Sequence, residues 1–387
     1  MAKTRKQSED LYDEIVDLLQ SKSLPVRKKA EDDDILIPTN LTIFDIYSGG
    51  GITLGKFHLF LANPGAGKST LALQCVSAIQ RKYEDAIILI IDTEAAMSRK
   101  RFQQLGVKLD KVLYCDAGIT LEKVMESIEG IIAIKREKIK KDPSYLKVPT
   151  IIVWDSIAQT PSEKELKTND INQTLGLNAR ILSAFFRTIT GYLAQYNITL
   201  LAVNQLREKP KLGPFDGINE INLPGLENKS IPGGKAQIFA AFSVLLMKPY
   251  TQLKPDKSGS FGFQGAITEC KFLKNKYVAP FHPFYMVLDY ANGFSEFWTN
   301  FLYLRDVLKV VGASGGYYSM EGYPKKFHLK KAYEYYQNDP KFKEVFDEHV
   351  ETLKEVLRKQ IETSKNLETQ LLEENIDDRD TNNSETT

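Results

Sequence analysis

Short, continuous apolar runs alternate with longer segments of helical periodicity over the first half of the chain. The apolar runs cover 57–61, 86–91, 150–154 and 198–203, and the helical patterns cover 69–83, 121–140 and 175–196. Strands that are apolar on both faces are typical of a parallel sheet that helices cover on each side. The pattern therefore predicts an α/β core with a central, mostly parallel sheet flanked by helices.

Three later apolar runs have short connections between them. They cover 242–247, 267–273 and 284–288, and short loops of this kind join antiparallel strands. We therefore expect an antiparallel extension of the sheet. After Gly293 the pattern becomes aromatic and helical, and it ends in a charged helix from Asp339 to about Leu372. This part of the sequence predicts a small C-terminal α+β domain.

The N-terminal segment 8–20 places Leu11, Ile15, Leu18 and Leu19 at helical spacing. A helix this short is not stable alone, so it needs a partner surface, either its own core or a neighbouring subunit. We interpret the charged stretch that follows as a linker. The expected organisation is an N-terminal helix and linker (1–35), an α/β core (36–292), a small C-terminal domain (293–367) and an acidic, disordered tail (368–387).

The segment after the first core strand carries the most specific chemistry. Residues 62–69, Ala-Asn-Pro-Gly-Ala-Gly-Lys-Ser, match a phosphate-binding loop whose first glycine is replaced, and they lie between a strand and a helix. Backbone N–H groups of such a loop face the phosphates, and Lys68 neutralises the terminal phosphate. Ala62 suits the loop if its φ is negative. The predicted nucleotide contacts are Asn63, Pro64, Gly65, Ala66, Gly67, Lys68, Ser69 and Thr70.

Two positions predict a magnesium site. Ser69 follows the loop lysine, and Asp155 ends the apolar strand 150–154. In a sheet with a phosphate-binding loop, a carboxylate at this strand end reaches the magnesium shell, usually through water. A loop-capping aspartate is the alternative for Asp155.

Further polar residues follow two other strands. Glu94 comes after the run that ends at Ile91, and Gln205 comes after the run that ends at Val203. Ligands of open α/β sheets bind at this edge. Glu94 is the predicted base that orients and deprotonates the attacking water, with Asp92 as the competing choice and helix capping as an alternative for either acid. Gln205 is the predicted γ-phosphate contact, so the catalytic set is Lys68, Glu94 and Gln205.

Two irregular segments leave the same predicted edge. They cover 162–174 and 206–232, and the longer one is rich in proline and glycine; compact domains rarely keep such a loop without a use for it. The helix after the first segment bears Arg180 and Arg187 seven residues apart, on one face. The alternatives for these arginines are phosphate contacts and a solvated face.

The cysteines and the hydropathy limit the class of protein. Cys75, Cys115 and Cys270 are far apart in sequence, which disfavours a disulfide framework and a zinc site and indicates a reducing compartment. No apolar run approaches the roughly twenty residues of a membrane span, and the polar start lacks a secretory core. We expect a cytoplasmic location and no membrane partner.

Charge is distributed unevenly. From Glu368 to Thr387 there are seven acidic residues and one arginine, a net charge of −6. Because the chain has 51 basic and 50 acidic residues in all, the remainder carries a net charge of +7. The tail is either a solubilising extension or a competitor of a polyanion for the basic surface.

Taken together, these motifs resemble the bacterial RecA recombinase family over about residues 36–350. They are Lys68-Ser69, Glu94, Asp155-Ser156, Leu-Gly-Leu-Asn-Ala-Arg at 175–180, Asn204-Gln205, Gly233-Gly234, and Lys-Asn-Lys followed by Ala-Pro-Phe within 271–281. The last motif and the one at 175–180 are absent from generic enzymes with a phosphate-binding loop. The divergent loop and the size of the chain are similar to the phage-type, UvsX-like members.

The resemblance implies roles for individual positions. It makes Glu94 the catalytic glutamate and Gln205 the γ-phosphate switch, and it leaves Arg101 where many members have an adenine-packing tyrosine. Lys274 and Lys276 would contact the ATP of a neighbouring subunit, Phe239 would be an interface aromatic, and the N-terminal helix would dock on the next protomer. The positions implied to contact DNA are Leu175, Arg180, Arg187, Arg207, Gly233 and Gly234.

The implied activity is ATP- and Mg²⁺-dependent filament formation on single-stranded DNA, with homologous pairing to duplex DNA, strand exchange and DNA-stimulated ATP hydrolysis. Single-strand-binding and mediator proteins are the further partners that it implies. One alternative is a hexameric helicase, which shares the nucleotide site but predicts closed rings and directional unwinding. Another is a binding protein whose ATP site only controls assembly, although a catalytic Glu94 disfavours it. A small-molecule kinase is disfavoured because no arginine-bearing lid is apparent.

Overall fold

The computed structural model describes residues 7, 11–15, 17–19, 34–168, 176–208, 225–226, 229–255 and 261–383. The chain divides into two compact units, 1–35 and 36–387. In the first unit residues 7, 11–15 and 17–19 are helical, and Leu11, Ile15 and Leu18 are exposed. Among the described residues no helix is both long and apolar enough to cross a bilayer.

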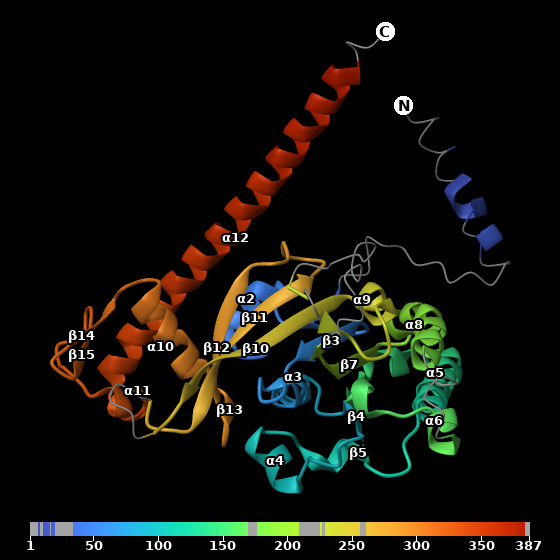
Figure 1. The fold of residues 1–387 in the computed structure, drawn as a ribbon, viewed down its shortest axis with the longest axis horizontal. Helices are drawn as coiled ribbons and strands as arrows, with labels where there is room; N and C mark the ends of the chain where they lie inside the picture. Colours follow the sequence, from blue (N-terminus) through green and yellow to red (C-terminus); the bar gives the residue numbers. More distant parts are fainter. Residues whose placement is uncertain are drawn as a thin grey trace. The chain divides into compact units, whose positions relative to one another are not determined.

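A nine-stranded sheet forms the centre of the second unit (Figure 1). Its order is β13-β12-β11-β10-β3-β7-β6-β4-β5; neighbours from β10 to β5 run parallel, and those from β10 to β13 run antiparallel. The strands are β3 (Phe57–Ala62), β4 (Ile87–Asp92), β5 (Val112–Cys115), β6 (Thr150–Asp155), β7 (Ile198–Gln205), β10 (Ser243–Leu253), β11 (Gly265–Lys274), β12 (Pro283–Asp289) and β13 (Gly293–Phe294).

This arrangement confirms the predicted mostly parallel sheet with an antiparallel extension, and it adds two details. The run at 242–247 belongs to β10, which still pairs parallel to β3, so the extension begins only at β11. The edge strand β5 was not expected, because its residues are mostly exposed and give no continuous apolar signal.

Helices cover both faces of the sheet. Along β3, Leu59 and Leu61 face one hydrophobic cluster, and Phe60 and Ala62 face another, as the alternation of side chains in a strand requires. The first cluster includes α5 (Leu121–Lys141) and α8 (Leu177–Gln195), and the second includes α2 (Thr42–Ser48) and α3 (Lys68–Lys82).

The C-terminal part packs into the second of these clusters. Phe301 and Phe342 are fully buried together with Phe60 of the sheet, so this part and the sheet share one core. Its elements are α10 (Glu296–Asp306), β14 (Val311–Ser314), β15 (Tyr317–Met320), α11 (Ala332–Asn338) and α12 (Pro340–Asn383). The small C-terminal domain boundary near 293 stays a prediction.

The expected disorder of the tail stays a prediction. Helix α12 continues through the acidic stretch to Asn383. Glutamate, glutamine and leucine are good helix formers, and extending an existing helix requires no new nucleus.

Shorter elements connect the layers. Strands β1 and β2 form a separate antiparallel pair, as do β8 and β9. The bounds are β1 (Leu36–Ile37), β2 (Ile52–Thr53), α4 (Arg99–Gln104), α6 (Glu163–Lys167), β8 (Arg207–Glu208), β9 (Lys229–Ser230) and α9 (Ala236–Ala240), with 3-10 turns at Leu109–Lys111, Pro143–Lys147, Ile157–Gln159 and Leu329–Lys331.

Candidate functional site

The phosphate-binding loop predicted from the sequence joins the end of β3 to the start of α3. Gly65 and Gly67 have left-handed backbones, with φ of 79° and 89°. A β carbon at Gly67 would lie 2.7 Å from Phe294 Cζ, so only glycine fits there. Ala66 is fully buried, and its carbonyl accepts a hydrogen bond from the Thr268 hydroxyl at 3.3 Å. The loop is therefore held in shape by the antiparallel extension of the sheet.

The first turn of α3 begins at Lys68, and Lys68, Ser69 and Thr70 are partly exposed. The N–H groups of a helix's first turn have no partner within the helix, and together with the helix dipole they favour an anion. Ala62 does not have a positive φ, so the condition for replacing the usual glycine is met. The segment can receive phosphates in the way the sequence predicts.

Asp155, the predicted magnesium ligand, ends β6 and is 4% exposed. Burial raises the pKa of its carboxyl group to about 6, although the Ser69 hydroxyl and the Lys68 charge lower it. Its Oδ1 atom is buried and has no hydrogen-bond partner among the described residues. An unpartnered carboxylate oxygen beside a serine hydroxyl fits Mg²⁺, which takes only one or two protein ligands at nucleotide sites.

Asp92, the competing catalytic acid, is engaged by its own loop. Its Oδ1 accepts a hydrogen bond from the Glu94 backbone at 3.1 Å. Its Oδ2 accepts from the backbones of Ala96 and Met97 at 3.0 and 2.9 Å, and from the Tyr114 hydroxyl at 2.7 Å. With both oxygens occupied and 1% exposure, Asp92 shapes the loop and leaves Glu94 as the carboxylate that water can reach.

Glu94 is exposed and lies against the end of β7. Its Oε1 atom accepts hydrogen bonds from Gln205 Nε2 at 2.7 Å and from Ser156 Oγ at 3.3 Å. Thr93 holds the residue before Glu94 against the end of β6. Its N–H donates to Asp155 O at 2.8 Å, and its hydroxyl accepts from Ser156 N at 2.9 Å. The carboxyl ends of β4, β6 and β7 are thus joined, and Glu94 and Gln205 are in direct contact.

The residues that flank each of the two predicted loops are bonded to one another at this edge. In the first, Glu165 Oε2 accepts from Ser162 N at 2.8 Å and from Asn178 Nδ2 at 3.0 Å, so the flanks of 169–175 are joined. In the second loop, β8 pairs with β9, so Arg207 and Glu208 near its start lie beside Lys229 and Ser230 near its end. Leu175 and residues 209–224 lie outside the described residues.

Three of the predicted DNA contacts are exposed arginines, and two are half-buried glycines. Arg180, Arg187 and Arg207 are exposed, and their side chains form no hydrogen bond or ion pair with a described residue. Guanidinium groups are suited to bidentate contacts with phosphates. Gly233 and Gly234 have positive φ, and added β carbons would lie 2.3 Å from Leu182 and 3.0 Å from Ala179, respectively. The end of the second loop therefore packs against α8, the helix that follows the first.

The predicted intersubunit residues lie further along the sheet. Phe239, the predicted interface aromatic, is 62% exposed. Lys274 Nζ donates to the carbonyls of Ile238 and Phe239 at 3.2 and 2.6 Å, and burial lowers its pKa. Lys276 is exposed. In this chain Lys274 therefore anchors α9, and a contact with a neighbour's phosphate would replace these two bonds.

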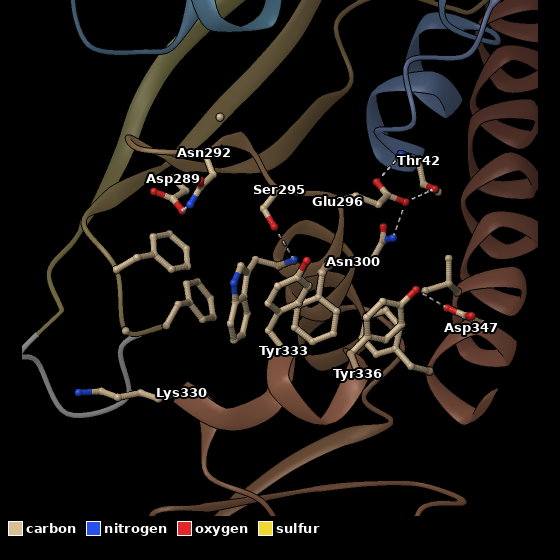
Figure 2. A pocket seen from close by; sticks show the side chains of 18 of the residues that line it. Thr42, Asp289, Asn292, Ser295, Glu296, Asn300, Lys330, Tyr333, Tyr336 and Asp347 are labelled. Atoms are coloured by element: carbon tan, nitrogen blue, oxygen red, sulfur yellow. Dashed lines mark hydrogen bonds between the residues drawn. The ribbon is translucent and has the colours of Figure 1, made fainter. Parts of the chain in front are cut away.

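A pocket of about 910 Å³ lies elsewhere, among α10, α11 and α12 (Figure 2). Glu296 lies in its wall and accepts hydrogen bonds from the Thr42 backbone and from Asn300 Nδ2, both at 2.7 Å; burial raises its pKa. None of the predicted site residues lines this pocket. Glu296 joins α2 to α10, which is a structural role.

Sequence reasoning did not assign roles to several residues of the site. Tyr114 and Thr93 position the Glu94 loop, as described above. Arg101 donates to the Tyr290 and Ala291 carbonyls at 3.1 and 2.8 Å and to the Thr70 hydroxyl at 2.9 Å. It therefore ties α4 to the phosphate-binding helix. No sequence motif marks these contacts, since each joins residues far apart in the chain.

Comparison with known proteins gives one consistent result. A family model described as the RecA N-terminal domain matches residues 24–295. The Protein RecA of Mycoplasma genitalium is 29% identical over 69% of this chain and 70% of its own length. That of Mycoplasma pneumoniae is 30% identical over 63% and 64%, and that of Crocosphaera subtropica is 24% identical over 81% of each chain.

Proposed function

Because the chain belongs to the RecA family, we propose that it is an ATP-dependent recombinase that forms helical filaments on single-stranded DNA and exchanges strands with homologous duplex DNA. The observation that carries the proposal is the contact between Glu94 and Gln205 at 2.7 Å. It joins the predicted base at the nucleotide site to the residue from which the longer loop begins. A site built in this way can make DNA binding depend on the nucleotide.

The nucleotide chemistry follows from the residues at the sheet edge. Lys68 and the N–H groups of the first turn of α3 hold the phosphates. Ser69 and Asp155 would hold Mg²⁺, which shields the phosphate charge when bound. Glu94 orients and deprotonates the attacking water. Gln205, already bonded to Glu94, contacts the γ-phosphate and changes its hydrogen bonds when that phosphate is lost.

DNA binding is assigned to the exposed arginines and the two loops. Arg180, Arg187 and Arg207, with the backbone at Gly233 and Gly234, would contact the phosphates of single-stranded DNA without strong sequence preference. Strand fidelity would come from base pairing. Leu175 is the proposed residue of the shorter loop that inserts between bases.

Assembly is assigned to a third set of residues. ATP bound at Lys68 of one protomer would be contacted by Lys274 and Lys276 of the next, with Phe239 and the N-terminal helix at the interface. ATP binding then favours one intersubunit geometry. The phage-type subclass, the cytoplasmic location and the single-strand-binding and mediator partners stay predictions from the resemblance.

Electron microscopy of the protein with a non-hydrolysable ATP analogue and single-stranded DNA tests the proposal. An open helical filament is the expected result. Closed six-membered rings would instead identify a helicase-like motor. Filaments without DNA-stimulated ATP hydrolysis would identify an assembly protein whose nucleotide only controls polymerisation.

A further inference from the structure

A buried pair of amide side chains lies behind the nucleotide sensor. Asn204 and Gln237 are both fully buried. Asn204 Nδ2 donates to Gln237 Oε1 at 2.8 Å, and Asn204 Oδ1 accepts the backbone N–H of Gln205 at 2.8 Å. The side chain of Asn204 is therefore fixed both to the sensor's own backbone and to Gln237.

Gln237 extends this network to the end of the second loop. Its Nε2 atom donates to the Pro232 carbonyl at 2.7 Å and to the Gly234 carbonyl at 2.9 Å. Asn204 Nδ2 donates to the same Pro232 carbonyl at 3.0 Å. Every polar atom of the two amides has a partner, and a buried network of this kind is rigid and is costly to break at any one member.

The loop end held by Gln237 in turn contacts α8. Gly233 fits so closely against Leu182 that a β carbon there would lie 2.3 Å from its Cδ1 atom. Leu182 lies on the helix that bears Arg180 and Arg187. Two side chains therefore connect the Gln205 backbone to both groups of proposed DNA contacts.

We propose that Gln237 is a positioning residue that couples the nucleotide sensor to the DNA-binding loops; this rests on the function proposed above. Gln237 is fully buried, so its side chain contacts only other groups of the protein. It acts by fixing the Pro232–Gly234 segment to Asn204, so that the geometry Gln205 adopts with ATP is the geometry in which the loops bind DNA. The measurable quantity is the factor by which nucleotide tightens DNA binding, which is a coupling between two sites.

The test compares Gln237→Met with a matched control. Methionine keeps the length of the side chain and removes all three of its hydrogen bonds. The control is Gln80→Met, because Gln80 is also buried and bonds the N–H and the carbonyl of Lys108 at 2.9 Å each, near the opposite end of α3 from the phosphate-binding loop. The Kd for an oligothymidylate is measured by fluorescence anisotropy, at one salt concentration, with and without a non-hydrolysable ATP analogue.

We expect the analogue to tighten DNA binding equally in the wild type and Gln80→Met. In Gln237→Met the ratio of the Kd for DNA without the analogue to the Kd with it should be about tenfold smaller than in the wild type, or equal to one. The Kd for the analogue itself should change less than about twofold. A purely structural role would weaken both affinities and leave the factor unchanged, and a wild-type factor in Gln237→Met overturns the proposal. If the wild type shows no tightening at all, the proposed function fails instead.

A measurement on the wild type covers the case in which Gln237→Met does not fold. Hydrogen exchange is followed with and without the analogue, in the absence of DNA. Slower exchange of the amides from Ile231 to Ala241 supports the coupling. Protection confined to the phosphate-binding loop and the Glu94 loop overturns it.

Discussion

Replacing Glu94 with glutamine is the most direct perturbation of the proposed chemistry. The amide keeps the size of the side chain, and its oxygen can still accept from Gln205, which now lies at 2.7 Å. What is lost is the basicity that deprotonates water, a loss of about 10²–10⁴ in rate for a general base. We therefore expect kcat to fall at least about 100-fold, which is about 2.7 kcal/mol in the activation barrier.

Binding should change much less than turnover. Exchanging a charged for a neutral acceptor at Gln205 costs about 1 kcal/mol or less, so the Kd for ATP should stay within about fivefold of the wild type. The assay is steady-state ATP hydrolysis with saturating single-stranded DNA, together with nucleotide titration.

A control for loss of an exposed carboxylate is available in the same chain. Glu84 is exposed and pairs with Lys108 at 3.3 Å beyond the C-terminal end of α3, and Glu84→Gln should hydrolyse ATP normally. Hydrolysis by Glu94→Gln within threefold of the wild type would refute its assignment as the base. Equal losses of ATP binding and kcat/KM would show that Glu94 serves binding instead.

Three further predictions follow from charge and burial. Changing Arg180 and Arg187 together to alanine should weaken single-stranded DNA binding and reduce the slope of log Kd against log salt by about one to two; an unchanged slope would return them to the solvated-face interpretation. Truncation after Leu367 removes the seven acids and should tighten duplex DNA binding most at low salt; superimposable titrations would leave the tail as a solubilising extension. His58 is buried with its pKa lowered to about 4, so as the pH falls from about 6.5 to about 4 the unfolded chain gains a proton that the fold excludes. The free energy of unfolding should then drop by up to about 3 kcal/mol, a pH dependence that urea titrations of His58→Asn should lack.

Local patterns in the sequence were sufficient to predict the fold class and to select the residues of the proposed nucleotide site. A phosphate-binding loop is a run of consecutive residues whose flanking strand and helix are also consecutive, so 62–69 could be identified without any tertiary information. The continuous apolar runs predicted the parallel sheet, because a strand that is buried on both faces has apolar residues at nearly every position. The carboxyl ends of those runs then indicated Asp155, Glu94 and Gln205, since parallel strands end at one edge.

Other features depend on partners distant in the chain, and only the tertiary structure decided them. Asp92 and Glu94 are equivalent by position; the backbone of 94–97 and the Tyr114 hydroxyl occupy one carboxylate and leave the other exposed. No sequence motif marks Gln237, because its proposed role depends on hydrogen bonds to Asn204 and Pro232, which lie 33 and 5 residues away.

The direction of β10 and the helix that runs to Asn383 also went beyond the sequence pattern. Short connections favour antiparallel neighbours, but the sheet places β10 beside β3, which is far from it in sequence. An acidic composition predicts a solvated segment without excluding a helix that continues from a packed one. Sequence determines what a segment can form by itself, and the assembled sheet edge determines which side chains meet there, because those contacts arise only when distant strands are brought together.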